Sequence, residues 1–367
     1  MTPDYQLRNH IPLSGPATRE PCDGTESRLR VSLGFTPLWY RDRLGIDFGE
    51  EWHNDPEYRY CSLVKMKEYL HEHFPSVPYF TPLYENGIEP TCATISGVYG
   101  ILLISMIYGA KPEYAADSWP DAKPIFSLED IQNLPVIDLD TNETFQKLWA
   151  QMDEIASRWG KIHGYLNYQG VINIATKLRG SELFLDMLDE PDTVKAFFKH
   201  IADTILQVSK RVQERQRRSG FAIDLLSMSN CTVSMISPEQ YEQFILPFDE
   251  DLSTHFSRFG IHTCNWVADP YLDGIRKIEK VGYFDTGVNS DLPRIKAMFP
   301  NTRRALLLTP GEFESAEMEE LKELVRRINR DYAPCDIVLA DIESSTPDSR
   351  IQEFLDMVRQ EESSPSI

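Results

Sequence analysis

The chain has 367 residues and a formal net charge of −20, because 37 Lys and Arg residues stand against 57 Asp and Glu residues. This acidity argues against a nucleic-acid-binding protein, which must neutralise phosphates with clustered basic side chains. The apolar share of 41% is ordinary for a globular protein, and the length suits one large α/β barrel or two medium domains. We therefore expect a protein that acts on a small molecule.

Residues 1–21 are polar and lack the apolar run of a signal peptide. The uncharged stretch Val98–Ala110 is shorter than the roughly 20 residues that cross a bilayer, and its composition predicts a buried helix. The six cysteines are scattered and form no Cys-x-x-Cys pair. We therefore expect a cytoplasmic protein with reduced thiols and no membrane contact.

The first part of the chain differs from the rest. Residues 1–75 are rich in proline, arginine and aromatic residues and show no regular alternation, which predicts an N-terminal cap packed on the main domain. A short β-like run at 161–169 precedes a long helical stretch at 171–218. Pro191 follows two acidic residues within that stretch, so it marks a break and the start of a second helix.

Strands and helices alternate after residue 220. Ser237 and Gln240 form a capping-box pattern that predicts the start of a helix running to 259. Strands are expected at 221–227, 261–266, 283–286, 305–309 and 336–340, with further helices at 271–279, 292–299, 316–332 and 350–360. No glycine-rich nucleotide fingerprint follows these strands. The pattern therefore favours an α/β protein, a TIM-like (β/α)8 barrel over residues 76–360, with a disordered tail at 361–367.

The sharpest candidate site is the pair His262 and Cys264. Active sites of such barrels lie at the carboxyl ends of the strands, and residues two apart on a strand point to the same side. An imidazole and a thiolate on one side are half of a zinc site. The alternative is a buried thiol and a hydrogen-bonded imidazole that merely line a pocket.

A catalytic zinc needs a third protein ligand. Cys335 begins the last predicted strand and should lie at the opposite end of the barrel. Asp341 lies at the correct end and is the preferred ligand, with Glu343 two residues further; the alternative is that both acidic groups precede the last helix as caps. Cys231 also ends a strand, but a nucleophilic thiol would need a histidine or a helix N-terminus beside it, and packing is the favoured role.

Other side chains at strand ends could shape a substrate pocket. The candidates for substrate binding are polar or aromatic: Trp39, Tyr168, Gln169, Asn230, Trp266 and Glu343. Trp39, Tyr40, Trp52 and Trp266 could form an aromatic wall, although such clusters are more often core. Arg41 and Arg43 could bind a carboxylate, with solvated surface as the alternative.

Several stretches resemble the uroporphyrinogen decarboxylase superfamily over roughly residues 150–360. They are Gly164–Gly180, Glu182–Pro191, Ile236–Pro247, Gly260–Cys264 and the run to Thr346–Pro347 before the last helix. The resemblance implies a TIM-like barrel with its active site at the carboxyl-terminal mouth. It also implies a homodimer.

The superfamily has two branches with different chemistry. The decarboxylase branch carries an Arg-Gln-Ala-Gly-Arg run that binds substrate carboxylates, whereas the corresponding Arg30–Arg41 region lacks it. The corrinoid-dependent methyltransferase branch uses His-x-Cys and a later Cys as zinc ligands; His262 and Cys264 match, but no Cys stands near Asp341. This chain thus resembles the methyltransferase branch more closely.

The leading hypothesis is a methyltransferase that moves a methyl group to or from a corrinoid on a carrier protein. Zinc would be held by His262, Cys264 and Asp341, which also form the expected catalytic set. Two alternatives stay open: a metal-free decarboxylase acting on uroporphyrinogen or another carboxylate through Arg41 and Arg43, and a ligand-binding barrel without catalysis.

Overall fold

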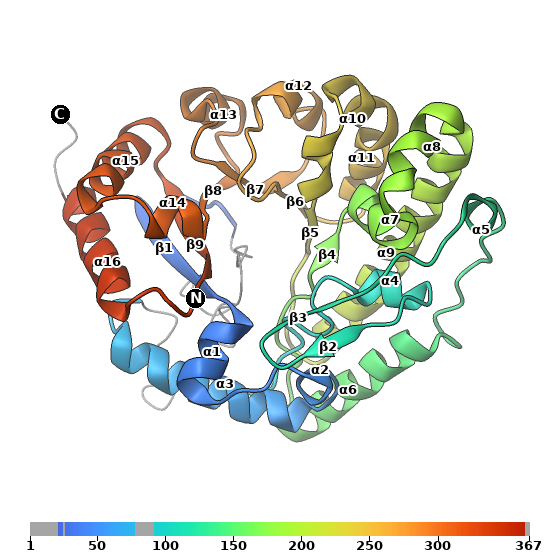
Figure 1. Ribbon diagram of the computed structural model, residues 1–367, viewed down its shortest axis with the longest axis horizontal. Helices are drawn as coiled ribbons and strands as arrows, with labels where there is room; N and C mark the ends of the chain where they lie inside the picture. The colour runs from blue at the N-terminus through green and yellow to red at the C-terminus, as the bar shows by residue number, and fades with distance from the viewer. Residues whose placement is uncertain (1–20, 25, 78–91, 364–367) are drawn as a thin grey trace.

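The computed structural model describes residues 21–24, 26–77 and 92–363. Its main feature is a parallel sheet whose strands lie in an arc with helices along the outer side (Figure 1). The strand order is β1-β9-β8-β7-β6-β5-β4. The strands are β1 (Leu29–Phe35), β4 (Tyr168–Gln169), β5 (Leu225–Ser229), β6 (Arg258–His262), β7 (Val281–Gly287), β8 (Arg303–Leu308) and β9 (Cys335–Ile342).

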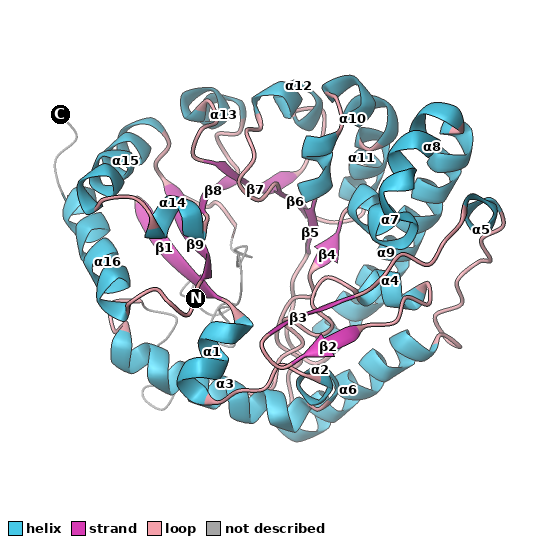
Figure 2. Ribbon diagram, viewed as in Figure 1, coloured by secondary structure: helices cyan, strands magenta, loops and turns pink. Residues whose placement is uncertain are grey.

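This arrangement confirms the expected α/β, TIM-like fold. Thr94 forms an isolated parallel bridge with His163, a residue that precedes β4. This bridge adds one more segment to the arc of strands. All residues of β5 and β8 are buried, as expected for parallel strands covered on both faces. Figure 2 shows the helices as an outer layer around the strands.

Helices follow the strands in the second half as the alternation predicts. They are α7 (Val171–Arg179), α8 (Leu183–Asp189), α9 (Pro191–Arg218), α10 (Pro238–Phe244), α11 (Leu246–Thr254), α12 (Leu272–Ile275), α13 (Leu292–Met298), α14 (Pro310–Glu314), α15 (Met318–Asp331) and α16 (Asp348–Ser363), with short 3-10 turns at Gly180–Glu182, Cys231–Met235 and Asp269–Tyr271. Pro191 begins α9, as predicted. Ser237 and Gln240 form the predicted capping box. The helix expected at 237–259 is divided into α10 and α11, because Pro247 opens the second helix.

The first half is less regular and contains α1 (Pro37–Leu44), α2 (Glu50–Asn54), α3 (Pro56–His73), α4 (Leu103–Ile107), α5 (Leu128–Gln132) and α6 (Glu143–Trp159). It also contains an antiparallel hairpin of β2 (Glu113–Ala115) and β3 (Ser118–Asp121). A helix is expected across Val98–Ala110, but the helix observed there, α4, is limited to Leu103–Ile107. The glycines at 97, 100 and 109 adopt positive φ and prevent a longer helix. Among the described residues, no helix combines the length and apolar character needed to cross a bilayer.

The expected domain limits need two corrections. β1 lies within the expected N-terminal cap, but it pairs with β9 along the main sheet, so the sheet begins before residue 76. The helix α16 runs to Ser363 and thus extends into the expected tail, of which residues 364–367 lie outside the described part. The cap segment is in part a piece of the barrel itself.

The amino ends of the strands are held by a buried ion cluster. Asp336 on β9 accepts from the guanidinium of Arg30 at 3.1 Å and also binds the guanidinium of Arg303 on β8. Cys335 lies beside it, so this cysteine is at the end of the barrel away from the candidate site, as the sequence predicts. The amino ends of the strands therefore have a structural role, and the candidate site lies at their carboxyl ends.

Candidate metal centre

Three ligand-type side chains meet at the carboxyl ends of β5 and β6. The side chains of Cys231, His262 and Cys264 each offer one ligand atom, and these atoms lie within 4.8 Å of one another. Nε2 of His262 lies 3.3 Å from Sγ of Cys264. All three residues are partly buried. No other such group of three occurs in the described part of the chain.

The register of two neighbouring strands produces this meeting. Ser229 of β5 pairs with His262 of β6, and the Asn230 backbone N–H donates to the His262 carbonyl at 2.8 Å. Cys231 and Cys264 each follow this pair by two residues, in the turns that leave the two strands. β6 ends at His262 rather than at the expected 266, and Cys264 adopts a left-handed backbone with φ of 61°. The turn, not strand alternation, brings its sulfur beside the imidazole.

Asp285 on β7 supports the histidine from behind. Its carboxylate lies 2.6 Å from Nδ1 of His262 and accepts from the Thr263 backbone N–H at 2.6 Å and from the Tyr283 hydroxyl at 2.8 Å. Asp285 is completely buried. The imidazole is therefore held by one nitrogen while the other faces the two thiols.

The electrostatics of the cluster favour a thiolate beside a charged imidazole. A hydrogen bond from Cys264 and the contact with His262 together lower the pKa of Cys231 to about 5, against the opposing effect of burial. Burial alone would lower the pKa of His262, but the charge and hydrogen bond of Asp285 and the contact with Cys231 raise it well above its ordinary value. The hydrogen bond with Cys231 and burial raise the pKa of Cys264.

Asn230, the residue before Cys231, anchors the turn that carries this cysteine. Its side-chain amide donates to Oδ2 of the fully buried Asp249 at 3.0 Å. A Cβ atom on Gly170 would lie 1.8 Å from Oδ1 of Asn230, so glycine permits the close approach of these two loops. Burial raises the pKa of Asp249 to about 7. Asn230 is only 2% exposed, and its contact with Asp249 positions the cysteine loop; its expected part in substrate binding stays a prediction.

The donor set fits a zinc ion. Zn–S and Zn–N bonds of about 2.3 and 2.0 Å in a tetrahedral site place ligand atoms roughly 3.5 to 3.8 Å apart, which the present separations of up to 4.8 Å approach. Two thiolates and an imidazole are also the ligand types that zinc prefers. A three-ligand set leaves a fourth position for a substrate.

Asp341 does not belong to this group of three, although it was the expected third ligand. It lies on β9 with φ of 51°, exposes its side chain, and contributes through its charge to the raised pKa of Cys264. β8 and β7 separate β9 from β6 in the sheet. Asp341 therefore lies on a strand that does not border β6, and its role as a ligand stays a prediction.

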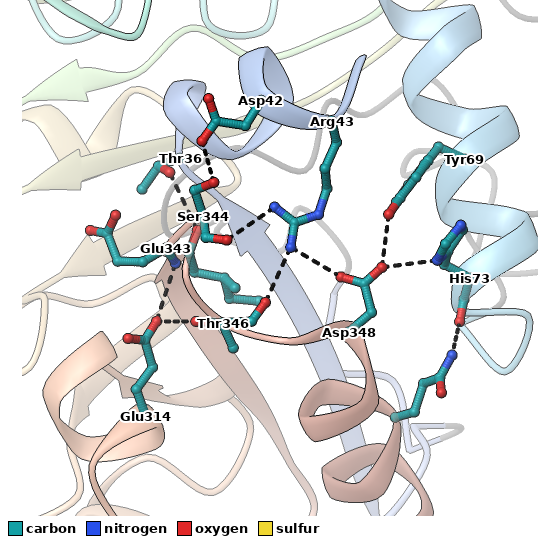
Figure 3. Close-up of polar contacts among 12 residues, drawn as sticks. Thr36, Asp42, Arg43, Tyr69, His73, Glu314, Glu343, Ser344, Thr346 and Asp348 are labelled. Carbon is teal, nitrogen blue, oxygen red and sulfur yellow. Dashed lines mark hydrogen bonds and ion pairs between the residues drawn. The ribbon is translucent and has the colours of Figure 1, made fainter. Parts of the chain in front are cut away.

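Glu343 lies at a corner between β9 and α16 that is internally satisfied (Figure 3). Its backbone N–H donates to Oε1 of Glu314 at 3.3 Å, and the Thr346 hydroxyl donates to the same oxygen. Burial, followed by the charges of Glu314 and Asp341, raises the pKa of Glu343. Its partly exposed carboxyl group remains available to a ligand.

The two arginines proposed as carboxylate grips are already engaged. Arg43 contacts the carbonyls of Ser344 and Thr346 and the carboxylate of Asp348 at 3.3 Å, and it stacks over Trp39 at 4.2 Å (Figure 3). Arg41 pairs with Asp117 at 2.8 Å on the surface. The structure gives the decarboxylase alternative no free arginine at these two positions.

The expected aromatic and polar pocket residues lie in different surroundings. Trp39 is completely buried and packs on Phe35, so it belongs to the core. Tyr168 is 2% exposed, and Gln169 accepts from the amide of Asn173 at 2.8 Å. Trp266 is partly buried and packs edge-on against Tyr271. Of these side chains, Trp266 is the one placed just past the metal cluster in sequence and still partly accessible.

Sequence reasoning gave no role to Asp285 and a packing role to Cys231. Cys231 follows one predicted strand, and Asp285 lies near the end of the strand predicted at 283–286, which is the relevant signal. What was missing was the register between strands, since a Ser-Asn-Cys turn beside a His-Thr-Cys turn places the two cysteines opposite each other only when Ser229 pairs with His262.

The fold and the position of the polar cluster define an α/β barrel protein with its candidate site at the carboxyl ends of the strands. A family model described as uroporphyrinogen decarboxylase (URO-D) matches residues 94–298, more than half of the chain, and the chain belongs to this family of enzymes. A search of curated proteins finds no match.

Two solved structures were compared. A methyltransferase from Methanosarcina mazei aligns with a TM-score of 0.65 and 12% identity over 92% of this chain and 95% of its own. A putative vitamin-B12 independent methionine synthase from Listeria monocytogenes aligns with a TM-score of 0.39 and 13% identity over 89% of this chain and 98% of its own. The likeness to the Methanosarcina structure agrees with the TIM-like fold.

Proposed function

We propose that this protein is a methyltransferase that holds a zinc ion with Cys231, His262 and Cys264 and moves a methyl group to or from a corrinoid on a carrier protein. The observation that carries the proposal is the convergence of the two sulfur atoms and one imidazole nitrogen within 4.8 Å. The similarity in fold to a methyltransferase agrees with it. Pairing of two copies, implied by the family resemblance, stays a prediction.

Each residue of the cluster has a distinct task. Cys231 and Cys264 would bind as thiolates, so both must release their protons when the ion enters, and the lowered pKa of Cys231 favours the first release. His262 would contribute Nε2 while Asp285 holds its other nitrogen. Bound zinc supplies a Lewis acid that lowers the pKa of a thiol or hydroxyl acceptor.

The surroundings favour a neutral or cationic small molecule as the methyl donor or acceptor. Asp341 and Glu343 are carboxylates near the mouth, while Arg43 is occupied by its own partners. We therefore keep Asp341 as a catalytic candidate that could accept a proton from the acceptor, and Glu343 and Trp266 as substrate-binding candidates. A polycarboxylate would meet repulsion here.

Elemental analysis of the purified protein tests the metal. We expect about one zinc ion per chain, its loss in Cys231→Ser, and its retention in Cys61→Ser, a control at an exposed cysteine on α3. The absence of zinc even after incubation with the metal, or full retention of zinc in Cys231→Ser, would overturn the zinc assignment.

Methyl transfer needs its own assay. With methylcobalamin as donor and a small thiol as acceptor, the methyl group moves from cobalt to sulfur, the bonding electrons stay on cobalt as cob(I)alamin, and the thiol proton is released. We expect an absorbance change that requires His262 and zinc. Zinc-loaded protein that leaves methylcobalamin unchanged, alone and with a range of thiols, would argue against corrinoid chemistry.

A further inference from the structure

The two oxygens of Asp285 have separate partners. Oδ2 receives the hydrogen bonds of His262 Nδ1 and the Tyr283 hydroxyl, at 2.6 and 2.8 Å, whereas Oδ1 receives the backbone N–H of Thr263 at 2.6 Å. The hydroxyl of Thr263 donates in turn to the Asp285 carbonyl at 2.7 Å. The carboxylate is thus fixed in one orientation by a backbone group that cannot rotate away.

We infer that Asp285 is a positioning residue that decides which nitrogen of His262 faces the metal, an inference that rests on the proposed function. Both oxygens of Asp285 already accept a hydrogen bond, from the Thr263 N–H and from the Tyr283 hydroxyl, so Nδ1 supplies the hydrogen in its 2.6 Å contact with Oδ2. A ring nitrogen that carries a hydrogen cannot bind a metal, so Nδ1 is excluded, and Nε2, which must release its own proton when the ion enters, is the ligand atom. Nε2 lies on the thiol side, 3.3 Å from Sγ of Cys264.

The variant Asp285→Asn reverses the direction of the hydrogen bond between this side chain and Nδ1 of His262 without removing it. The Thr263 N–H requires an acceptor at the Oδ1 position, so the amide oxygen must occupy that place. The amide nitrogen then stands where Oδ2 stood and donates to Nδ1 of His262. Nδ1 becomes an acceptor, the ring keeps its hydrogen on Nε2, and the ligand nitrogen is blocked, although the side chain has nearly the same size. The Tyr283 hydroxyl, which donates to Oδ2 in the wild type, must turn to accept from the amide nitrogen.

Nitrogen-15 NMR of histidine-labelled, metal-free protein measures this directly. The His262 signals are assigned by their loss in His262→Gln. We expect Nδ1 to carry a hydrogen in the wild type and to be unprotonated in Asp285→Asn. An unprotonated Nδ1 in the wild type would overturn the inference without any variant, and a protonated Nδ1 in Asp285→Asn would do the same.

Zinc affinity provides the second readout, by competition with a chelator. Asp285→Asn should weaken zinc binding by about 10- to 100-fold, the effect usual for the hydrogen-bond partner of a metal-binding histidine. Tyr283→Phe removes one donor from Oδ2 but leaves the acceptor for His262, so its zinc affinity should change by less than about threefold. Equal zinc affinity of Asp285→Asn and the wild type would refute the inference.

The two measurements separate the possible failures. If the wild type binds no zinc, the proposed function fails, while NMR still decides whether Asp285 fixes the ring. If the wild type binds zinc but Asp285→Asn binds it equally well, the metal centre stands and the positioning role fails. A purely structural role for Asp285 would change the thermal midpoint in both variants without moving the hydrogen on His262.

Discussion

Two regions at the carboxyl ends of the strands are rich in ionisable groups, but they differ in what those groups do. At the corner between β9 and α16, Arg43, Asp348, Tyr69 and His73 satisfy one another: the carboxylate of Asp348 accepts from the Tyr69 hydroxyl at 2.8 Å and lies 2.9 Å from His73 (Figure 3). At the ends of β5 and β6, three ligand atoms face one another.

The difference distinguishes a cluster that stabilises the fold from a cluster that can bind a ligand. Groups of the corner bind donor to acceptor and join α1 and α3 to the start of α16, so removing one should weaken the fold. Groups of the metal cluster are supported from outside, by Asp285 and by Asn230, and keep their inner atoms directed at a common point. Removing one of these should weaken ligand binding, which the loss of a corner group should leave unchanged.

The largest expected effect is on metal binding. His262→Ala should reduce zinc affinity by at least about a hundredfold, because the loss of a ligand should exceed the 10- to 100-fold effect of losing its hydrogen-bond partner. The unfolding midpoint of the metal-free protein should also fall, because the buried Asp285 carboxylate loses its partner. Chelator competition and thermal unfolding measure the two quantities, and undiminished zinc affinity would remove the distinction between the regions.

Asp249, behind the cysteine loop, should make stability depend on pH. Its pKa of about 7 in the folded protein exceeds that of the unfolded chain, so its stabilising contribution is full below about pH 4 and is lost as the pH rises through 7. The shift corresponds to at most about 4 kcal/mol. The unfolding free energy of Asp249→Asn, measured against pH, should lack this decline. The control Asp251→Asn, on the exposed side of α11, should retain it. Identical pH profiles for the wild type and Asp249→Asn would contradict this expectation.

The corner should respond in stability alone. Asp348→Asn places an amide nitrogen against donors of Tyr69 and His73, and we expect a loss of roughly 1 to 3 kcal/mol in unfolding free energy. Denaturant unfolding measures it, with Asp273→Asn as a control, because the exposed pair of Asp273 with Arg294 should contribute less than about 1 kcal/mol. A large fall in zinc affinity in Asp348→Asn would show that the two regions are coupled.

The smallest effect is expected at Arg41. Its pair with Asp117 is nearly half exposed on both sides, so Arg41→Ala should change the unfolding free energy by less than about 1 kcal/mol. Binding of carboxylate ligands, followed by calorimetry, should be equally unaffected. A marked loss of carboxylate affinity would instead revive the decarboxylase alternative.

Much of the second half of the fold could be predicted from the sequence, because each strand there is an apolar run followed by a helix with recognisable start signals such as Ser237 and Pro191. β1 escaped prediction because Leu29–Phe35 contains Arg30 and Ser32 and lies among irregular, charged segments. Its strand character depends on pairing with β9, which is more than 300 residues away in the chain.

The site was predictable in part for a similar reason. His262 and Cys264 stand two apart in one motif, so local spacing reveals them. Cys231 lies 31 residues earlier and joins them only through the register of β5 with β6. Asp341 occupies the equivalent end of β9, but the strands neighbour one another in chain order, so β7 and β8 stand between β9 and β6.

The left-handed backbone of Cys264 carries an evolutionary consequence. A non-glycine residue with φ of 61° sacrifices about 1 to 2 kcal/mol of folding free energy. Selection for folding stability alone would replace this cysteine with glycine, which adopts a positive φ without a steric penalty. Retention of cysteine in descendants of this chain would therefore be a record of selection on the sulfur atom, and its replacement by glycine would mark lineages that have abandoned the chemistry while keeping the scaffold.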